Sequence, residues 1–158
     1  MRDAESPVRR ISSSWTFFYK RVFPIIWFGV LGVVTFIVLS TGAAAKDPTF
    51  LVVPGFMAFI GFLIMRALVW DLADEVFDRG DALLIRNGGE EELIRLSNIM
   101  NVSVSTYVNP PRISLRLITP GTFGSEIAFS PLTGFRLNPF AKNQVAEDLI
   151  VRVHQARS

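Results

Sequence analysis

Residues 24–40 read PIIWFGVLGVVTFIVLS and residues 49–70 read TFLVVPGFMAFIGFLIMRALVW, and these two apolar runs decide the fold. Each run is close to the roughly 20 residues that an α-helix needs to cross a bilayer. The short linker TGAAAKDP at residues 41–48 separates them. We therefore expect a transmembrane helical hairpin over residues 22–70, with its first helix at about 22–41 and its second at 49–70.

The hairpin divides the chain into three parts. We predict a basic N-terminal arm at residues 1–21, the hairpin at residues 22–70, and one compact domain at residues 71–158. The 158-residue chain is 50% hydrophobic, which is high for a soluble protein and is explained by the hairpin. The part that follows the hairpin is long enough for one small domain but not for two.

The composition excludes several kinds of chemistry. The chain has no cysteine, which excludes disulfides and thiolate metal sites, and its single histidine, His154, excludes a multi-histidine site. The net charge of +2 is small and scattered, which argues against nucleic acid as a partner. Because the sequence also has no nucleophile–base pair, phosphate-binding loop or metal-ligand spacing, we expect no enzyme, no cofactor and no metal site.

Charges around the apolar runs predict the orientation in the membrane. Arginine and lysine are frequent before the first run, whereas the linker has only Lys46, offset by Asp47. Since Lys and Arg accumulate on the cytoplasmic side, we expect a multi-pass protein of the inner (plasma) membrane with both termini in the cytoplasm. An alternative is a signal peptide cleaved near Ala45, in which case the second run still carries the domain to the same side.

Aromatic and basic side chains flank both runs. Trp and Tyr rings suit the headgroup level of a bilayer, and a long Arg side chain near a helix end can extend to the same level. The expected membrane-interface anchors are Arg9, Arg10, Trp15, Tyr19, Lys20, Arg21, Arg66 and Trp70.

After Asp74 the apolar residues alternate, which is typical of strands. Asn87, Gly88 and Gly89 form a strong β-hairpin signal, and Ile113, Leu115 and Leu117 alternate as the buried face of a strand. The expected strands are residues 74–78, 82–86, 92–96, 101–108, 112–118 and 125–130, with a short last strand at 134–137.

The chain then returns to helical spacing. Asn138 is a candidate N-cap with Pro139 at the first helical position, and Val145, Leu149 and Val153 form one apolar stripe. We therefore predict an α+β membrane protein: a two-helix hairpin followed by a small antiparallel barrel or sandwich of six to seven strands with a C-terminal capping helix.

This order of elements resembles the pleckstrin-homology (PH) fold, and more narrowly the bacterial membrane-anchored PH-domain-like proteins. The resemblance rests on DEVFDRGDALLIR, EEELIRLSNIMNVSVS, NPPRISLRL and PGTFGSEIAFSP. It implies a PH-like domain that serves as a platform for protein interaction or assembly. Lipid-binding members usually carry several Lys or Arg at the first hairpin, whereas here Arg79 lies between Asp78 and Asp81, a poor site for a multiply charged phosphate.

A polar face is expected on the two strands at 101–108 and 112–118. This candidate binding patch for an acidic partner or lipid headgroups has a plain alternative as a solvated sheet face. Its residues are Ser103, Ser105, Tyr107, Arg112, Ser114 and Arg116.

An acidic run directly follows the second apolar run. Carboxylates can bind Ca²⁺, but these residues lack the glycine-bearing loop spacing of an EF-hand. We expect these carboxylates to pair with the basic N-terminal arm instead. The run consists of Asp71, Asp74, Glu75, Asp78 and Asp81.

These observations lead to one main functional hypothesis. We expect a non-catalytic membrane protein whose cytoplasmic domain binds protein, either further copies of itself or another membrane protein, while the hairpin contacts membrane lipids. One alternative is a module that senses anionic lipids through Arg112, Arg116 and the basic arm. Another is an accessory subunit of a membrane transporter or channel, which rests on the hairpin alone.

Overall fold

The structure is a computed structural model that describes residues 8–105, 107–108, 110–132 and 143–158. The chain divides into two compact units. One is the helical segment Phe17–Trp70, here called the hairpin unit. The other joins the residues up to Thr16 with Asp71–Ser158 and is here called the strand domain.

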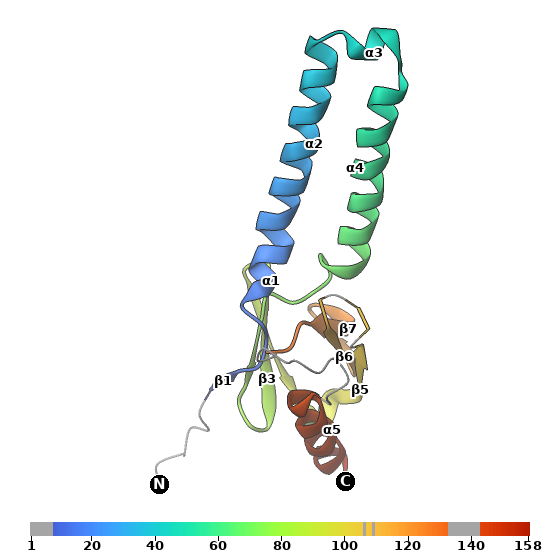
Figure 1. The fold of residues 1–158 in the computed structure, drawn as a ribbon. Coiled ribbons are helices and arrows are strands. Elements are labelled where there is room, and N and C mark those ends of the chain that lie inside the picture. The colour runs from blue at the N-terminus through green and yellow to red at the C-terminus, as the bar shows by residue number, and fades with distance from the viewer. Residues whose placement is uncertain (1–7, 106, 109, 133–142) are drawn as a thin grey trace. The chain divides into compact units, whose positions relative to one another are not determined.

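The hairpin unit contains the two long apolar helices that the sequence predicts (Figure 1). The first apolar helix covers Trp15–Ser40 and begins earlier than expected, because a short helix and a π-helical turn precede its main part. Gly42, at a φ of 68°, follows it in the left-handed conformation that favours glycine. The elements are α1 (Trp15–Phe17), the π-turn Phe18–Val22, α2 (Phe23–Ser40), α3 (Ala43–Lys46) and α4 (Thr49–Leu68).

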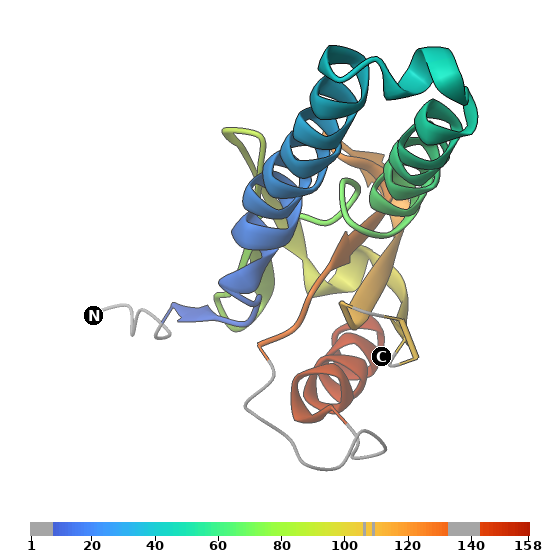
Figure 2. The same cartoon turned by 45° about the horizontal axis from the view of Figure 1, so that its top comes forward.

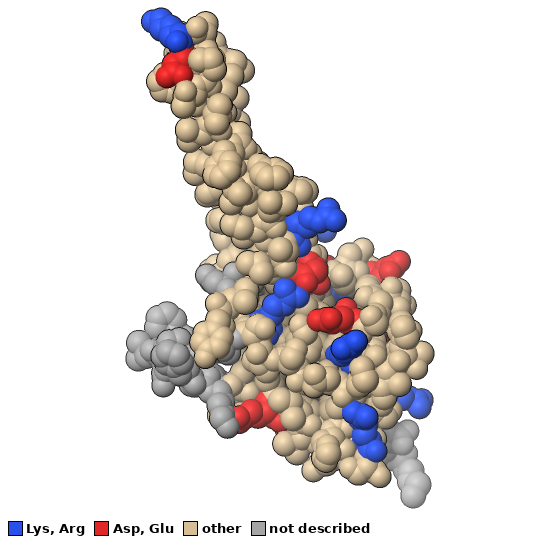
Figure 3. Space-filling model, turned by 90° about the vertical axis from the view of Figure 1, so that its right-hand side faces the viewer, with Lys and Arg blue, Asp and Glu red and all other residues tan. Residues whose placement is uncertain are grey.

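Both long helices are long and apolar enough to cross a membrane. Many of their large apolar side chains are exposed, among them Ile25 at 72% and Phe36 at 70%. On the face that Figure 3 presents, charged side chains lie at the tip of the hairpin and at its opposite end, with an uncharged stretch between. Apolar exposure on this scale is typical of a surface that meets lipid or protein rather than water.

One close contact joins the two long helices. A Cβ atom at Gly61 of α4 would overlap the indole ring of Trp27 of α2, so only glycine admits the ring at this position. In contrast, a Cβ atom at Gly29, Gly32 or Gly55 would meet nothing within 4 Å. Of the four glycines in the two runs, Gly61 is thus the one at which a side chain of the other helix packs against the backbone.

The strand domain consists of two antiparallel sheets and a C-terminal helix (Figures 1 and 2). The turn at Gly88 and Gly89, with φ values of 62° and 91°, confirms the predicted hairpin. One sheet has the order β1-β2-β3-β4, with strands Arg9–Arg10, Glu75–Asp78, Ala82–Asn87 and Glu90–Arg95. The other has the order β5-β6-β7, with strands Ile99–Ser105, Arg112–Gly121 and Gly124–Phe129.

The C-terminal helix α5 (Gln144–Arg157) packs beside β5 and the 3₁₀ turn Leu96–Asn98 (Figure 2). Asn143 is its N-cap, and the Asn143 side chain accepts a hydrogen bond of 3.0 Å from the Val145 amide. The helix therefore begins later than expected, and the predicted cap at Asn138 and the predicted strand at 134–137 lie outside the described residues.

One core is shared by both sheets and α5. The predicted buried faces are confirmed for β6, where Ile113, Leu115 and Leu117 are at most 3% exposed, and for Leu149 and Val153 of α5. The largest fully buried side chains of this core include Val76, Leu83, Ile85, Ile99, Ile113, Leu115, Phe129 and Leu149.

The first strand, β1, is the main difference from the sequence prediction. It lies before the hairpin unit in the chain, yet it pairs with β2, which follows the hairpin unit. Ile11, directly after β1, is 4% exposed and belongs to the shared core. The segment 9–13 is therefore an integral part of the strand domain, and the whole hairpin unit is inserted in the connection between β1 and β2.

Segment 9–13 also joins the two sheets. On one side the Ile11 amide donates to the Val76 carbonyl at 2.9 Å, and the buried Ser12 hydroxyl accepts from the Val76 amide at 2.9 Å. On the other side the Ser13 amide donates to Ser130 at 2.8 Å and the Leu132 amide donates to Ile11 at 2.7 Å. These bonds link β2 to the segment that directly follows β7, and they give the backbone of the buried Val76 its partners.

Candidate functional site

The predicted polar patch lies on β5 and β6, with Tyr107 just beyond the end of β5. Ser103 is the cross-strand partner of Ser114, and Ser105 is the partner of Arg112. Arg116 lies opposite Asn101 on one side and Glu126 of β7 on the other. The structure therefore brings five of the six predicted residues onto neighbouring positions of one sheet, and it places Tyr107, 90% exposed, in the connection between the strands.

The two arginines of this patch already face carboxylates of the same chain. The Arg112 guanidinium forms an ion pair of 2.5 Å with Asp71, and its side chain is only 16% exposed. Arg116 is exposed, but Glu126 is its neighbour across the strands. The patch is therefore less positive than the sequence of β6 alone indicates.

The acidic run contacts several different partners rather than one basic arm. The expected pairing with the arm is confirmed for Glu75, which lies 3.1 Å from Arg10. Glu75 also lies 3.6 Å from Arg86, and Asp74 accepts a hydrogen bond from the Gly88 amide at 2.8 Å. Within the described residues, no three acidic or histidine side chains come together as a group that could hold a metal ion.

The predicted membrane-interface anchors lie in both units. Arg9 and Arg10 form β1, whereas Trp15 begins the first helical segment. The Trp70 ring contacts the Phe62 ring edge-to-face, with centroids 5.4 Å apart. Tyr19, Lys20 and Arg21 lie in the π-turn, and Arg66 lies in the last turn of α4.

A bidentate ion pair joins α5 to the turn between β2 and β3. The Arg152 guanidinium contacts both carboxylate oxygens of Asp78, at 2.5 and 2.7 Å, and also donates to the Gly80 carbonyl at 2.8 Å. Burial raises the pKa of Asp78, but hydrogen bonds from Arg152 and the Gly80 amide, with the charges of Arg152 and Arg9, lower this pKa more strongly. The pKa of Asp78 therefore lies below its ordinary value, and the pair is ionised at neutral pH.

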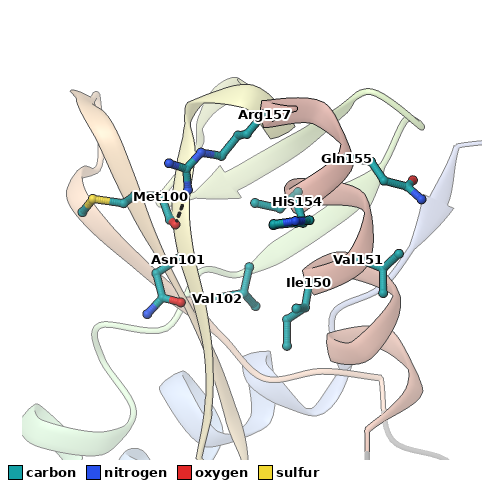
Figure 4. Close-up of a pocket in the computed structure, with 9 residues that line it drawn as sticks. Met100, Asn101, Val102, Ile150, Val151, His154, Gln155 and Arg157 are labelled. Carbon is teal, nitrogen blue, oxygen red and sulfur yellow. Dashed lines mark hydrogen bonds between the residues drawn. The ribbon is translucent and has the colours of Figure 1, made fainter.

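An open groove of about 480 Å³ lies between β5 and α5 (Figure 4). Its floor is apolar, with Val102 and Val153 at 9% and 5% exposure. Ile150 and Val151 on its helical side are about half exposed. It is lined by Met100, Asn101, Val102, Ile150, Val151, Val153, His154, Gln155 and Arg157.

One hydrogen bond crosses the groove. The Arg157 guanidinium donates to the Met100 carbonyl of β5 at 2.8 Å (Figure 4). The nine described lining residues include one imidazole, His154, and no carboxylate. The arrangement can bind an apolar or extended ligand by burial and hydrogen bonding.

Sequence reasoning did not find this groove. The sequence places Val153 on the C-terminal helix, but the groove depends on how α5 packs against β5, and these segments are far apart in the chain. The available signal is weak: Ile150 lies beside the apolar stripe of α5 and widens it beyond what one buried face needs.

Comparisons with protein-family models, with curated proteins and with solved structures find no match to this chain.

Proposed function

We propose that this chain is a non-catalytic protein of the inner membrane, in which the helical hairpin tethers a PH-like domain that binds protein. The partner is either a further copy of the chain or another membrane component. The observation that carries the proposal is the groove between β5 and α5, because half-exposed apolar side chains line it. Concave apolar surfaces of this kind are typical of binding sites.

The order of the elements supports a PH-like domain. Four antiparallel strands, then three, then one C-terminal helix follow each other along the chain. In this interpretation the hairpin unit is an insertion in the connection between the first and second strands of the domain.

The pairing of β1 with β2 supports a two-span topology. If both long helices cross the membrane, β1 and β2 can pair only when the chain returns to the side from which it started. The excess of Lys and Arg before the first helix favours the cytoplasm for that side. A membrane-tethered platform facing the cytoplasm is consistent with both arguments.

The two alternative functions have less support. The anionic-lipid hypothesis relies on Arg112 and Arg116, yet one is bound to Asp71 and the other faces Glu126. The transporter hypothesis needs polar side chains within the spans, and both long helices are strongly apolar.

The test is native mass spectrometry of the full-length protein purified in mild detergent. We expect a defined multimer or a reproducible protein partner. The variant Ile150→Glu, which puts a charge in the groove, should lose this partner. The control Ile118→Glu should keep it, because Ile118 is similarly exposed, at 53% against 45%, and does not line the groove.

Two results would contradict the proposal. One is a single chain that carries stoichiometric anionic lipid and no protein, which would favour lipid sensing. The other is a partner that Ile150→Glu and Ile118→Glu retain equally, which would show that the groove is not the binding site.

A further inference from the structure

We infer that the connection between β5 and β6 contacts the headgroup layer of the membrane, with the ring of Tyr107 as its anchor. The inference rests on the membrane tether of the proposed function and not on its groove. Tyr107 is 90% exposed, more than any other large apolar or aromatic side chain that the structure describes. A single exposed side chain is common on protein surfaces, so the position of this one carries the argument.

The connection lies beside the point at which the chain leaves the hairpin unit. It is followed by Arg112, the first residue of β6, whose guanidinium pairs with Asp71 at 2.5 Å. Asp71 is the first residue of the strand domain after α4, which ends at Leu68. Three residues of extended chain span at most about 11 Å, so Asp71 lies at or near the headgroup layer if α4 crosses the membrane.

The other chain connection leaves the strand domain at the same end of the three-stranded sheet. The Ser130 carbonyl, directly after β7, accepts a hydrogen bond from the Ser13 amide at 2.8 Å, and the chain passes into the hairpin unit after Thr16. Phe129, the last residue of β7, lies opposite Ile113, the second residue of β6. The end of the sheet that carries the β5–β6 connection is therefore the end from which the chain continues to both long helices.

The composition of the connection suits an interface of lipid and water. Residues 101–111 read NVSVSTYVNPP and contain no charged residue. The turn between β3 and β4 is also close to this end, because its Gly88 amide donates to Asp74, but it leads into Glu90 and Glu91, whose carboxylates favour water. A tyrosine ring, apolar with a polar hydroxyl, is typical of the headgroup level.

Lipid is also the occupant that the chain itself brings to this surface. Both long helices would hold the strand domain against the headgroup layer whether or not a protein partner is bound. The contact differs from recognition of anionic lipids, because the Arg112 side chain is 16% exposed and already pairs with Asp71. We therefore expect the contact to form on neutral lipid.

The absence of cysteine from the chain allows the depth of single side chains to be measured. Full-length variants with one cysteine are spin-labelled in phosphatidylcholine vesicles, and relaxation by oxygen, which concentrates in lipid, is compared with relaxation by a water-soluble nickel chelate. The oxygen-to-nickel ratio at Tyr107→Cys should exceed that at Ile118→Cys severalfold. Ile118 is the control because it is 53% exposed and lies about 20 Å beyond Arg112 along β6.

A second variant keeps the tyrosine and tests its role. A label at Val108→Cys should also have a high ratio. Adding Tyr107→Asp should lower this ratio to near the value at Ile118→Cys, because a carboxylate is costly to remove from water. An unchanged ratio would show that Tyr107 is not the anchor and would overturn the inference. A high ratio at Tyr107→Cys that appears only with added phosphatidylglycerol would also overturn it, in favour of anionic-lipid recognition.

A label at Val33→Cys separates the inference from the proposed function. Val33 lies in the middle of α2 and is 58% exposed. A high ratio at Val33→Cys with a low ratio at Tyr107→Cys overturns the inference and leaves the membrane tether standing, and low ratios at both positions overturn both. Poor access of both reagents to Tyr107→Cys would show a protein contact and would overturn the inference as well.

Discussion

Replacement of Ile11 by alanine tests whether the segment before the hairpin belongs to the strand domain. Ile11 is 4% exposed and lies in the shared core, whereas Val8, only three positions earlier, is 55% exposed. The substitution removes three carbons at ~0.8 kcal/mol each, or about 2.4 kcal/mol. The cavity that remains raises the expected loss of unfolding free energy to about 3 kcal/mol. Val8→Ala should cost less than about 0.5 kcal/mol.

The assay is hydrogen exchange with mass spectrometry on the full-length protein in detergent. All three tryptophans lie at positions 15, 27 and 70, in or beside the helices, so their fluorescence reports poorly on the core of the strand domain. When exchange requires opening of the domain, a loss of about 3 kcal/mol accelerates it by roughly a hundredfold, since 1.4 kcal/mol corresponds to tenfold. The acceleration should be measured in the peptides that contain β2 and β7.

The matched pair of variants makes the reasoning refutable. If Ile11→Ala accelerates exchange in β2 and β7 no more than Val8→Ala does, segment 9–13 does not contribute to the core. The domain would then be complete from Asp71 onward. A strong effect confined to Ile11→Ala would instead establish that the strand domain is built from both sides of the hairpin.

Two further predictions concern the ion pair and the hairpin. Asp78→Asn should lower the unfolding free energy by about 2 kcal/mol at pH 7, because it weakens a charged hydrogen-bonded pair. The pKa of Asp78 is lower in the folded protein than its unfolded value of about 3.9, so the difference in unfolding free energy between Asp78→Asn and the unchanged protein should persist above that value. The difference should vanish as the pH falls through the folded pKa. Urea unfolding measures it, and midpoints that differ equally at every pH would contradict this prediction. Gly61→Leu should displace Trp27 toward lipid and so increase the quenching of Trp27 fluorescence by brominated lipid. The fluorescence is measured in a protein in which phenylalanine replaces Trp15 and Trp70. The control Gly29→Leu should leave the quenching unchanged, because a Cβ atom at Gly29 meets nothing within 4 Å.

The elements that the sequence predicts well are those with local causes. The apolar helices depend only on runs of apolar residues, and the turn at Gly88 and Gly89 depends on the positive φ that glycine tolerates. The alternation of Ile113, Leu115 and Leu117 directly predicts a strand with one buried face. In each case neighbouring residues determine the conformation, so one sequence is enough to find it.

The features that the sequence does not predict depend on contacts between distant residues. β1 has two arginines and no alternating pattern, and it becomes a strand only because β2 and Ser130–Leu132 bond to the segment. The sequence contains many basic residues that could pair with Asp78, but it does not show that Arg152 is the one that does. The groove, likewise, exists only once α5 has packed beside β5.

The insertion of the hairpin unit also constrains how the domain folds. Val76 receives its partners from Ile11 and Ser12, which precede both long helices, so the first sheet is completed only after both helices have been synthesised. Ile11 and Val76 share one core with Ile113 and Leu115 of the sheet that contains β5. If the helices span the membrane, this core forms only in a chain whose two helices have both inserted, because otherwise β1 and β2 lie on opposite sides. The groove between β5 and α5 would then be presented on a complete domain only by chains whose two helices have both inserted, which would restrict binding at the groove to chains that have reached their final topology.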